Sequence, residues 1–138
     1  MTTLGPSPAG PRGVIGAAAE VAAATHLSAS GWRIVARNVR IGPDEIDIVA
    51  LEPGEPPTLV IVEVRSRSGP AFGSAVESVD GRKVARLYRA ALALRRAGLA
   101  GWSTRSTDCA WRVDLLALTG DLVSGWRVET HLRGLAPP

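Results

Sequence analysis

The stretch DEIDIVALE, residues 44–52, alternates acidic and aliphatic residues, and TLVIVEVRSR, residues 58–67, follows it after the breaker PGEPP. Alternation with period two is typical of strands, and a Pro/Gly segment between two such runs predicts an antiparallel hairpin. A carboxylate in a strand that packs on a core costs several kcal/mol unless it is paired, protonated or bound to a cation. The acids Glu45, Asp47 and Glu63 therefore need partners.

The register of this hairpin decides which partners the acids have. A hairpin centred near Glu55 places Asp47 opposite Glu63, a repulsive pair, and Glu45 opposite Arg65, an attractive one. Alternation also predicts one common face for Glu45 and Asp47. Two neighbouring carboxylates are tolerated if one keeps its proton or if a hard divalent cation lies between them, and Mg²⁺ takes one or two carboxylates and keeps several waters. The spacing alone leaves a solvated edge with exposed ion pairs as the alternative.

The composition describes a small soluble chain. It has 138 residues, 46% of them hydrophobic, which suits a single domain over 13–133 with a disordered tail at 1–12 and a short C-terminal tail at 134–138. The formal charge of +3 favours an anionic partner such as nucleic acid. A single cysteine, Cys109, excludes a disulfide framework or a Cys-rich zinc site. Without a signal peptide or membrane span, we expect a cytoplasmic protein.

The remaining pattern predicts two helices and three further strands. An Ala-rich helix ends before Gly31, and Asp80 caps a second helix that stops at Gly98. The predicted elements are helices at 13–30 and 81–97 and strands at 32–38, 44–52, 58–67, 111–118 and 125–132. The order α-β-β-β-α-β-β predicts an α/β domain with a mixed sheet flanked by helices.

The second helix separates apolar from basic residues. Its apolar positions at helical spacing are Val84, Leu87, Tyr88, Ala91 and Leu94, and its basic positions are Arg82, Lys83, Arg86 and Arg89. With Arg67 nearby in sequence, the basic face would suit the phosphate backbone of a nucleic acid, where contacts give affinity without reading sequence. A solvated helix face explains the pattern equally well.

Four segments in combination carry a resemblance to a known family. They are AEVAAATHLSASGWRIVARNVR at 19–40, DEIDIVA at 44–50, VIVEVRSR at 60–67 and FGSAVESVDGRKVARL at 72–87. Together they resemble the UPF0102 family of bacterial proteins, and this resemblance implies an endonuclease of the restriction-endonuclease-like (PD-(D/E)XK) superfamily. The resemblance runs from about Gly13 to Leu118.

The resemblance implies a nuclease fold whose central mixed sheet presents an Asp, a Glu and a Lys around Mg²⁺, with Mn²⁺ as a substitute. By position, Asp47 and Glu63 would be the metal ligands, Arg65 stands in the place of the lysine, and Glu20 matches the helix acid that completes the catalytic set. The implied activity is metal-dependent hydrolysis of phosphodiester bonds in DNA or structured nucleic acid. Paired cuts in this superfamily often imply a homodimer.

One departure from the family pattern keeps other functions open. An Arg at position 65 stays protonated, so it can stabilise charge but cannot act as a general base. The alternatives are a nucleic-acid-binding module of the same fold that cleaves little, and a protein-interaction module. Lys83 would be a substitute donor if its helix points inward, and otherwise a phosphate contact. The role of Asp114 is left open between catalysis and structure, and His131 is expected to be structural.

Overall fold

The computed structural model describes residues 11–67, 80–98 and 110–137, so most of the predicted N-terminal tail and Cys109 lie outside the described residues. The described elements follow the predicted order. They are α1 (Pro11–Ala29), β1 (Arg33–Ile41), β2 (Asp44–Glu52), β3 (Thr58–Arg67), α2 (Gly81–Ala97), β4 (Trp111–Asp121) and β5 (Gly125–Leu132). Among these residues, no helix is long and apolar enough to span a membrane.

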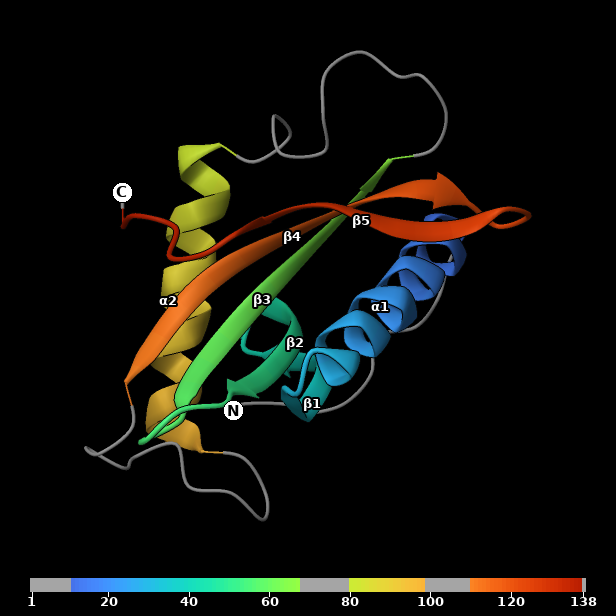
Figure 1. Ribbon diagram of the computed structural model, residues 1–138. Helices are drawn as coiled ribbons and strands as arrows, with labels where there is room; N and C mark the ends of the chain where they lie inside the picture. Colours follow the sequence, from blue (N-terminus) through green and yellow to red (C-terminus); the bar gives the residue numbers. More distant parts are fainter. Residues whose placement is uncertain (1–10, 68–79, 99–109, 138) are drawn as a thin grey trace.

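The strands form one mixed sheet in the order β1-β2-β3-β4-β5, and the two helices lie on its opposite faces (Figure 1). Only the central β3–β4 pair is parallel, while the other three pairs are antiparallel. A parallel pair needs a crossover connection, and α2 lies in the segment between these two strands. The predicted α/β class with a mixed sheet is confirmed.

Two apolar layers hold the helices to the sheet. The α2 layer contains Val39, Ile41, Ile46, Val49, Leu59 and Ile61 beneath Leu87, Ala90, Ala91 and Leu94. The α1 layer contains Ile48, Ala50, Val60, Val62, Leu116 and Leu118 beneath Ala23, Ala24 and Leu27. The strands β3 and β4 therefore read as nearly continuous hydrophobic runs, because both of their faces are covered.

The ends of α2 have the chemistry that the sequence predicts. Asp80 is extended, and its Oδ1 accepts a hydrogen bond from the backbone N–H of Lys83 at 3.0 Å. At the other end, Gly98 has a φ of 75° and its N–H donates to the carbonyl of Leu94 at 2.8 Å. The Asp80 cap fixes the first turn of α2, from which Lys83 projects.

The strand β1 is longer than predicted, since it runs to Ile41 and not to residue 38. The prediction ended the strand at a polar residue, Asn38, whose φ of 53° is unusual for a strand. Pairing with β2 nevertheless continues beyond it, through Arg40 with Glu45, up to a turn at Gly42. The extension matters because it carries β1 and β2 together past the candidate site.

Candidate functional site

The hairpin of β2 and β3 opens into a fork at Asp47. The pairing has the predicted register from Glu52 with Thr58 to Ile48 with Val62, and it ends there, whereas β2 stays paired with β1 as far as Asp44. Beyond the last pair, Oδ2 of Asp47 accepts a hydrogen bond from the backbone N–H of Val64 at 2.8 Å. A side chain thus occupies a position that a strand partner would otherwise fill.

The strand β2 also changes face at this point. Ile46 packs in the α2 layer, whereas Ile48 packs in the α1 layer. Strict alternation would put both on one face. The strand therefore turns over between Ile46 and Ile48 as it leaves β3, while Glu45 and Asp47, predicted on one face, line the same cavity. Glu45 pairs in backbone register with Arg40 of β1.

The second acid of the fork, Glu63, lies on β3 directly after the last β2–β3 pair and is only 4% exposed. Its Oε1 lies 3.4 Å from Nζ of Lys83 and 3.6 Å from Nε of Arg65. Its Oε2 is buried and accepts no hydrogen bond from any residue that the structure describes. We call Asp47, Glu63, Arg65 and Lys83 the fork site.

The electrostatics of the fork site favour protonated acids. Burial raises the pKa of Asp47 well above its usual range, the carboxylate of Glu63 raises it further, and the Val64 N–H opposes both. Burial also raises the pKa of Glu63, against the ammonium of Lys83 and the guanidinium of Arg65. Two adjacent acids whose charged forms are not fully compensated are what a cation site requires.

The third predicted acid, Glu20, comes from α1 on the other face of the sheet and is half-buried. Burial raises its pKa to about 7; the guanidinium of Arg37 opposes this, and the carboxylates of Glu45 and Glu63 add to it. A carboxyl group with such a pKa changes charge near neutral pH, as a group that exchanges protons should.

The donor set of the fork fits a small hard cation with open positions. Over residues 11–67, 80–98 and 110–137, no group of three or more His, Cys, Asp or Glu is arranged so that it could hold a metal ion. Asp47 and Glu63 thus offer two carboxylates, with the remaining ligands left to water or substrate. Mg²⁺ and Mn²⁺ accept such a set, whereas a structural zinc site does not.

A cavity of about 220 Å³ opens onto the fork site. Its lining combines acidic and basic side chains: Pro43, Asp44, Glu45, Asp47, Lys83, Arg86 and Leu87. Lys83 and Arg86 project into it from one side of α2, one helical turn apart. The cavity therefore gives a negatively charged group access to Asp47 beside two cations.

The predicted basic face of α2 is divided by its contacts. Lys83 turns inward to Glu63, as a substitute for the missing lysine would. Arg89 forms two hydrogen bonds to the carboxylate of Asp44, at 2.8 and 2.7 Å. Arg82 and Arg86 are exposed, and Arg67 at the end of β3 is half-buried.

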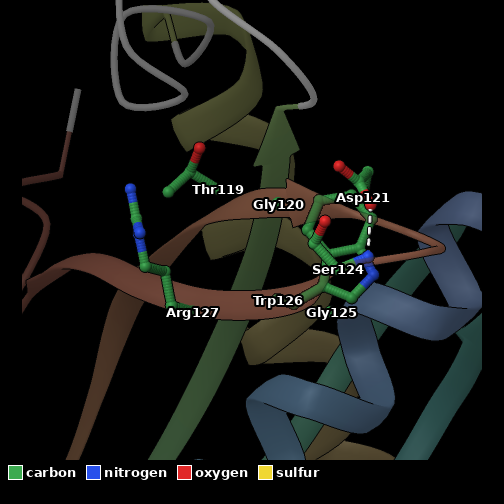
Figure 2. A pocket seen from close by; sticks show the side chains of 7 residues that line it. All are labelled: Thr119, Gly120, Asp121, Ser124, Gly125, Trp126 and Arg127. Atoms are coloured by element: carbon green, nitrogen blue, oxygen red, sulfur yellow. Dashed lines mark hydrogen bonds between the residues drawn. The ribbon is translucent and has the colours of Figure 1, made fainter.

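A larger hollow of about 480 Å³ lies at the β4–β5 turn, lined by Thr119, Gly120, Asp121, Ser124, Gly125, Trp126 and Arg127 (Figure 2). Its acid, Asp121, accepts hydrogen bonds from the N–H groups of Val123 and Ser124 and so serves the turn. The register places Arg67, Thr119 and Arg127 side by side on β3, β4 and β5. This hollow is lined by hydroxyl groups and one guanidinium, but it has only one acid and therefore no pair of carboxylates.

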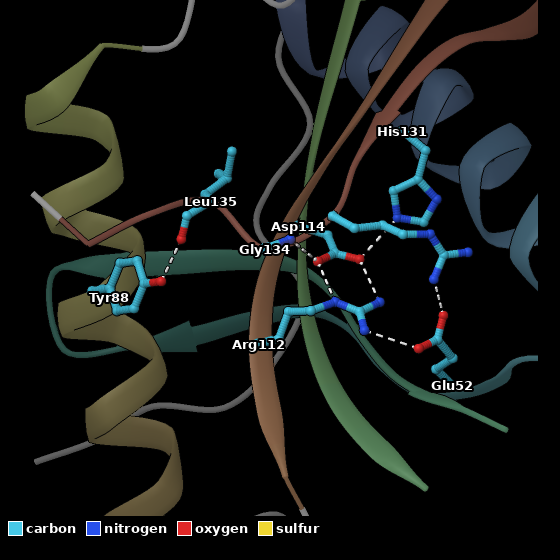
Figure 3. Close-up of polar contacts among 8 residues, drawn as sticks. Glu52, Tyr88, Arg112, Asp114, His131, Gly134 and Leu135 are labelled. Carbon is cyan, nitrogen blue, oxygen red and sulfur yellow. Dashed lines mark hydrogen bonds and ion pairs between the residues drawn. The ribbon is translucent and has the colours of Figure 1, made fainter. Parts of the chain in front are cut away.

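Asp114, which pairs in backbone register with Val62, belongs to a separate network that reaches Glu52 at the other end of β2 (Figure 3). Its carboxylate is 0% exposed and accepts hydrogen bonds from Arg112 at 2.7 and 2.9 Å and from the Gly134 N–H at 2.9 Å. Nε2 of His131 lies 2.8 Å from its Oδ2. Arg112 and Arg133 both bind Glu52. We call these six residues the Asp114 network, and its geometry gives Asp114 and His131 a structural role.

Comparison with known proteins agrees with the motifs. The model of a family described as "Uncharacterised protein family UPF0102" matches residues 19–118. The chain belongs to the UPF0102 family.

Its UPF0102 relatives cover most of the chain. A UPF0102 protein of Deinococcus radiodurans is 44% identical over 83% of this chain and 89% of its own length. One from Moorella thermoacetica is 53% identical over 68% of this chain and 74% of its own length. One from Arthrobacter sp. is 42% identical over 88% of this chain and 95% of its own length. The match at 19–118 includes the fork site and Glu20, but not His131 or Gly134.

Sequence analysis missed Asn38, whose amide nitrogen, when turned to Glu20, lies 2.6 Å from Oε1 of that carboxylate. Asn38 lies within the motif at 19–40, but no hydrophobic pattern or charge distinguishes it there. The available signal was an Asn inside a β-branched run, a residue type that tolerates left-handed backbone better than its neighbours do.

Proposed function

We propose that this UPF0102 protein is a divalent-metal-dependent endonuclease that hydrolyses phosphodiester bonds in DNA. The observation that carries the proposal is the pair Asp47 and Glu63, two buried acids with raised pKa values beside a cavity with basic walls. Two buried carboxyl groups side by side do not stabilise a fold, because burial and their mutual repulsion disfavour the charged forms. A role of Asp47 and Glu63 as metal ligands in phosphodiester hydrolysis would account for the pair.

Asp47 and Glu63 would hold the cation through their carboxylate oxygens. The buried Oε2 of Glu63, which no described residue satisfies, is the atom most in need of such a partner. When bound, Mg²⁺ or Mn²⁺ lowers the pKa of water and offsets negative charge on a phosphoryl group. The hydrogen bond from the Val64 N–H fixes the orientation of the Asp47 carboxylate.

Lys83 supplies the ammonium that the family pattern places on the strand. Its Nζ lies 3.4 Å from Glu63, so it reaches the same carboxylate as Arg65 from the first turn of α2. Both side chains remain partly exposed, at 22% and 32%. Each can therefore also contact a nonbridging phosphate oxygen in the cavity, and charge stabilisation of this kind is a large term in catalysis.

Glu20 is the candidate proton acceptor. With a pKa of about 7, its carboxylate is partly ionised at neutral pH and can take a proton from an attacking water. Arg65 cannot do this because a guanidinium does not deprotonate in proteins. The departure at position 65 thus leaves proton transfer to Glu20 and charge stabilisation to Arg65 and Lys83.

The nucleic acid would approach along the basic residues around the fork. Arg82 and Arg86 on α2 are exposed, and the row of Arg67, Thr119 and Arg127 crosses three strands. Contacts of this type bind phosphates without reading sequence and weaken steeply with salt. We expect Arg82→Ala and Arg86→Ala each to reduce the salt dependence of binding by about one phosphate contact.

The decisive experiment is cleavage of labelled duplex, single-stranded, flapped and four-way-junction DNA with Mg²⁺ or Mn²⁺. Asp47→Asn and Glu63→Gln keep the shape of each side chain and remove its charge. We expect each to lower cleavage at least about 100-fold, the scale of removing one electrostatic catalytic group. Glu129→Gln is the matched control, because Glu129 is an exposed acid on the edge strand β5.

The outcomes distinguish three functions. Cleavage that needs metal, Asp47 and Glu63 supports the nuclease. Salt-sensitive binding without cleavage would favour a binding module of the same fold, for which Arg65 is the supporting residue. If the protein neither binds nor cleaves nucleic acid and does not respond to metal, the protein-interaction module is the remaining function.

The substitute role of Lys83 has its own test. We expect Lys83→Ala to lower kcat by about 10- to 100-fold. Arg65→Lys in the Lys83→Ala background should restore part of that loss, because it returns an ammonium to Glu63 from the strand. If Lys83→Ala changes only the KM, the side chain is a phosphate contact and no more.

A further inference from the structure

Asn38 on β1 is a backbone exception. Among the described residues it is the only one other than glycine with a positive φ, 53°. Asn adopts this left-handed conformation more readily than most residues, although Gly adopts it at lower cost. The conformation alone therefore does not require an asparagine at this position.

The register places Asn38 at the fork. Its neighbours Arg37 and Val39 pair with Ile48 and Ile46, so Asn38 stands opposite Asp47. Ile48 packs towards α1, whereas Val39 and Ile46 pack towards α2. The strands β1 and β2 thus change face together in the row that contains the proposed metal ligand.

The side chain of Asn38 meets Glu20 of α1. With the amide nitrogen turned to Glu20, it donates to Oε1 at 2.6 Å and to Oε2 at 3.1 Å. In the other orientation the amide oxygen would face a carboxylate, which is repulsive. The other charges near Glu20 act in opposite directions: Arg37 attracts its carboxylate, whereas Glu45 and Glu63 repel it.

We propose that Asn38 is a positioning residue, whose side-chain amide holds the Glu20 carboxylate at the fork beside Asp47. This role rests on the proposed nuclease function. Asn38 acts through Glu20 and touches neither substrate nor metal. The left-handed backbone turns its amide away from the strand ladder and towards α1, which explains why a strained residue lies in the middle of β1.

Two substitutions separate the amide from the backbone. Asn38→Gly keeps the left-handed conformation at no steric cost and removes the side chain. Asn38→Asp keeps the size and the tolerance of positive φ but replaces the donor by a carboxylate, which repels Glu20. A role confined to the backbone would leave both variants as active as the parent.

The first measurement is a double-mutant cycle of urea unfolding without metal, at pH 8, with Asn38→Gly, Glu20→Gln and the double variant. If the two side chains are in contact, the two single changes in unfolding free energy do not add. Changes that do add would show that the contact is absent and would overturn the proposal.

The second measurement is the same cycle for cleavage with Mn²⁺. We expect Asn38→Gly and Asn38→Asp to lower kcat about 10-fold or more with KM changed less than about twofold, and the double variant to be no slower than Glu20→Gln alone. An Asn38→Gly variant that cuts like the parent would overturn this inference while the nuclease stands. If the parent cuts nothing, the proposed function fails and this role with it, and the unfolding cycle would still report the contact.

Discussion

The fork site and the Asp114 network both bury acids on the central strands, and they treat them in opposite ways. Asp114 receives hydrogen bonds from Arg112 and the Gly134 N–H, and His131 lies against it. Burial alone would raise the pKa of Asp114, but these partners lower it to about 2. At the fork, burial prevails, and the pKa of both Asp47 and Glu63 is raised.

The number of hydrogen bonds that a buried acid accepts separates structural from functional acids in this fold. The Asp114 network ties the C-terminal segment to the sheet, because Gly134 binds Asp114, Leu135 donates to the carbonyl of Val113, and Tyr88 donates to the carbonyl of Leu135. Among the residues that the structure describes, the acids at the fork receive no comparable set of hydrogen bonds. An acid with its hydrogen bonds filled stabilises the fold, whereas an acid left short of partners is available to a ligand.

The largest expected effect is at Asp114. Asp114→Asn should destabilise the protein by about 3 to 5 kcal/mol, because it leaves the half-buried Arg112 without its main partner. Urea unfolding of the variant beside Glu129→Gln measures this. A loss below about 1 kcal/mol would contradict the structural role of Asp114, since it would then behave as a surface acid.

The next effect is a pH dependence of opposite sign in the two regions. The pKa of Asp114 is lowered from 3.8 to about 2, so its stabilisation of about 2 kcal/mol is present above pH 4 and lost as the pH falls through 2. The pKa of Glu20 is raised from 4.5 to about 7, so the native state holds a proton that the unfolded chain releases. Stability then declines as the pH rises from 4.5 to 7, by less than the roughly 3 kcal/mol of the full shift, because solvent screens a half-buried group.

Urea unfolding of the metal-free protein across pH 2 to 8 tests both signs. The parent should be most stable near pH 4 to 5, and Glu20→Gln should flatten the decline above that pH while leaving the acid limb in place. A parent whose stability rises from pH 5 to 7 would show that the acids at the fork are compensated.

The sequence predicted the elements well, for a physical reason. Alternation in DEIDIVALE and the Asp80 and Gly98 signals are local, so the bounds of β2, β3, α2 and β5 were predicted to the residue. The end of β1 was predicted wrongly, because the pairing of Arg40 with Glu45 depends on a second strand and not on the local composition.

The candidate site was predicted in its residues but not in its geometry. The repulsive pair of Asp47 and Glu63 followed from a register that is confirmed up to Ile48 and Val62. The fork, the change of face and the donor role of Asn38 did not follow, because each depends on how β1 and β2 leave β3 together. The inward turn of Lys83 was one of two options, and its contact with Glu63 required the placement of α2.

The smallest expected effect is a gain in stability at Asp47, opposite in sign to the loss expected at Asp114. Asp47→Asn should stabilise the metal-free protein at pH 7 by about 1 kcal/mol, because burial and Glu63 disfavour the ionised carboxyl, whereas the neutral amide still accepts a hydrogen bond from the Val64 N–H. Mg²⁺ at about ten times its Kd should then stabilise the parent by about 1.4 kcal/mol and leave the variant unchanged. Thermal unfolding with and without Mg²⁺ measures both changes. A variant less stable than the parent would mean that Asp47, like Asp114, is held by the fold for stability, and the cation would lose its main ligand.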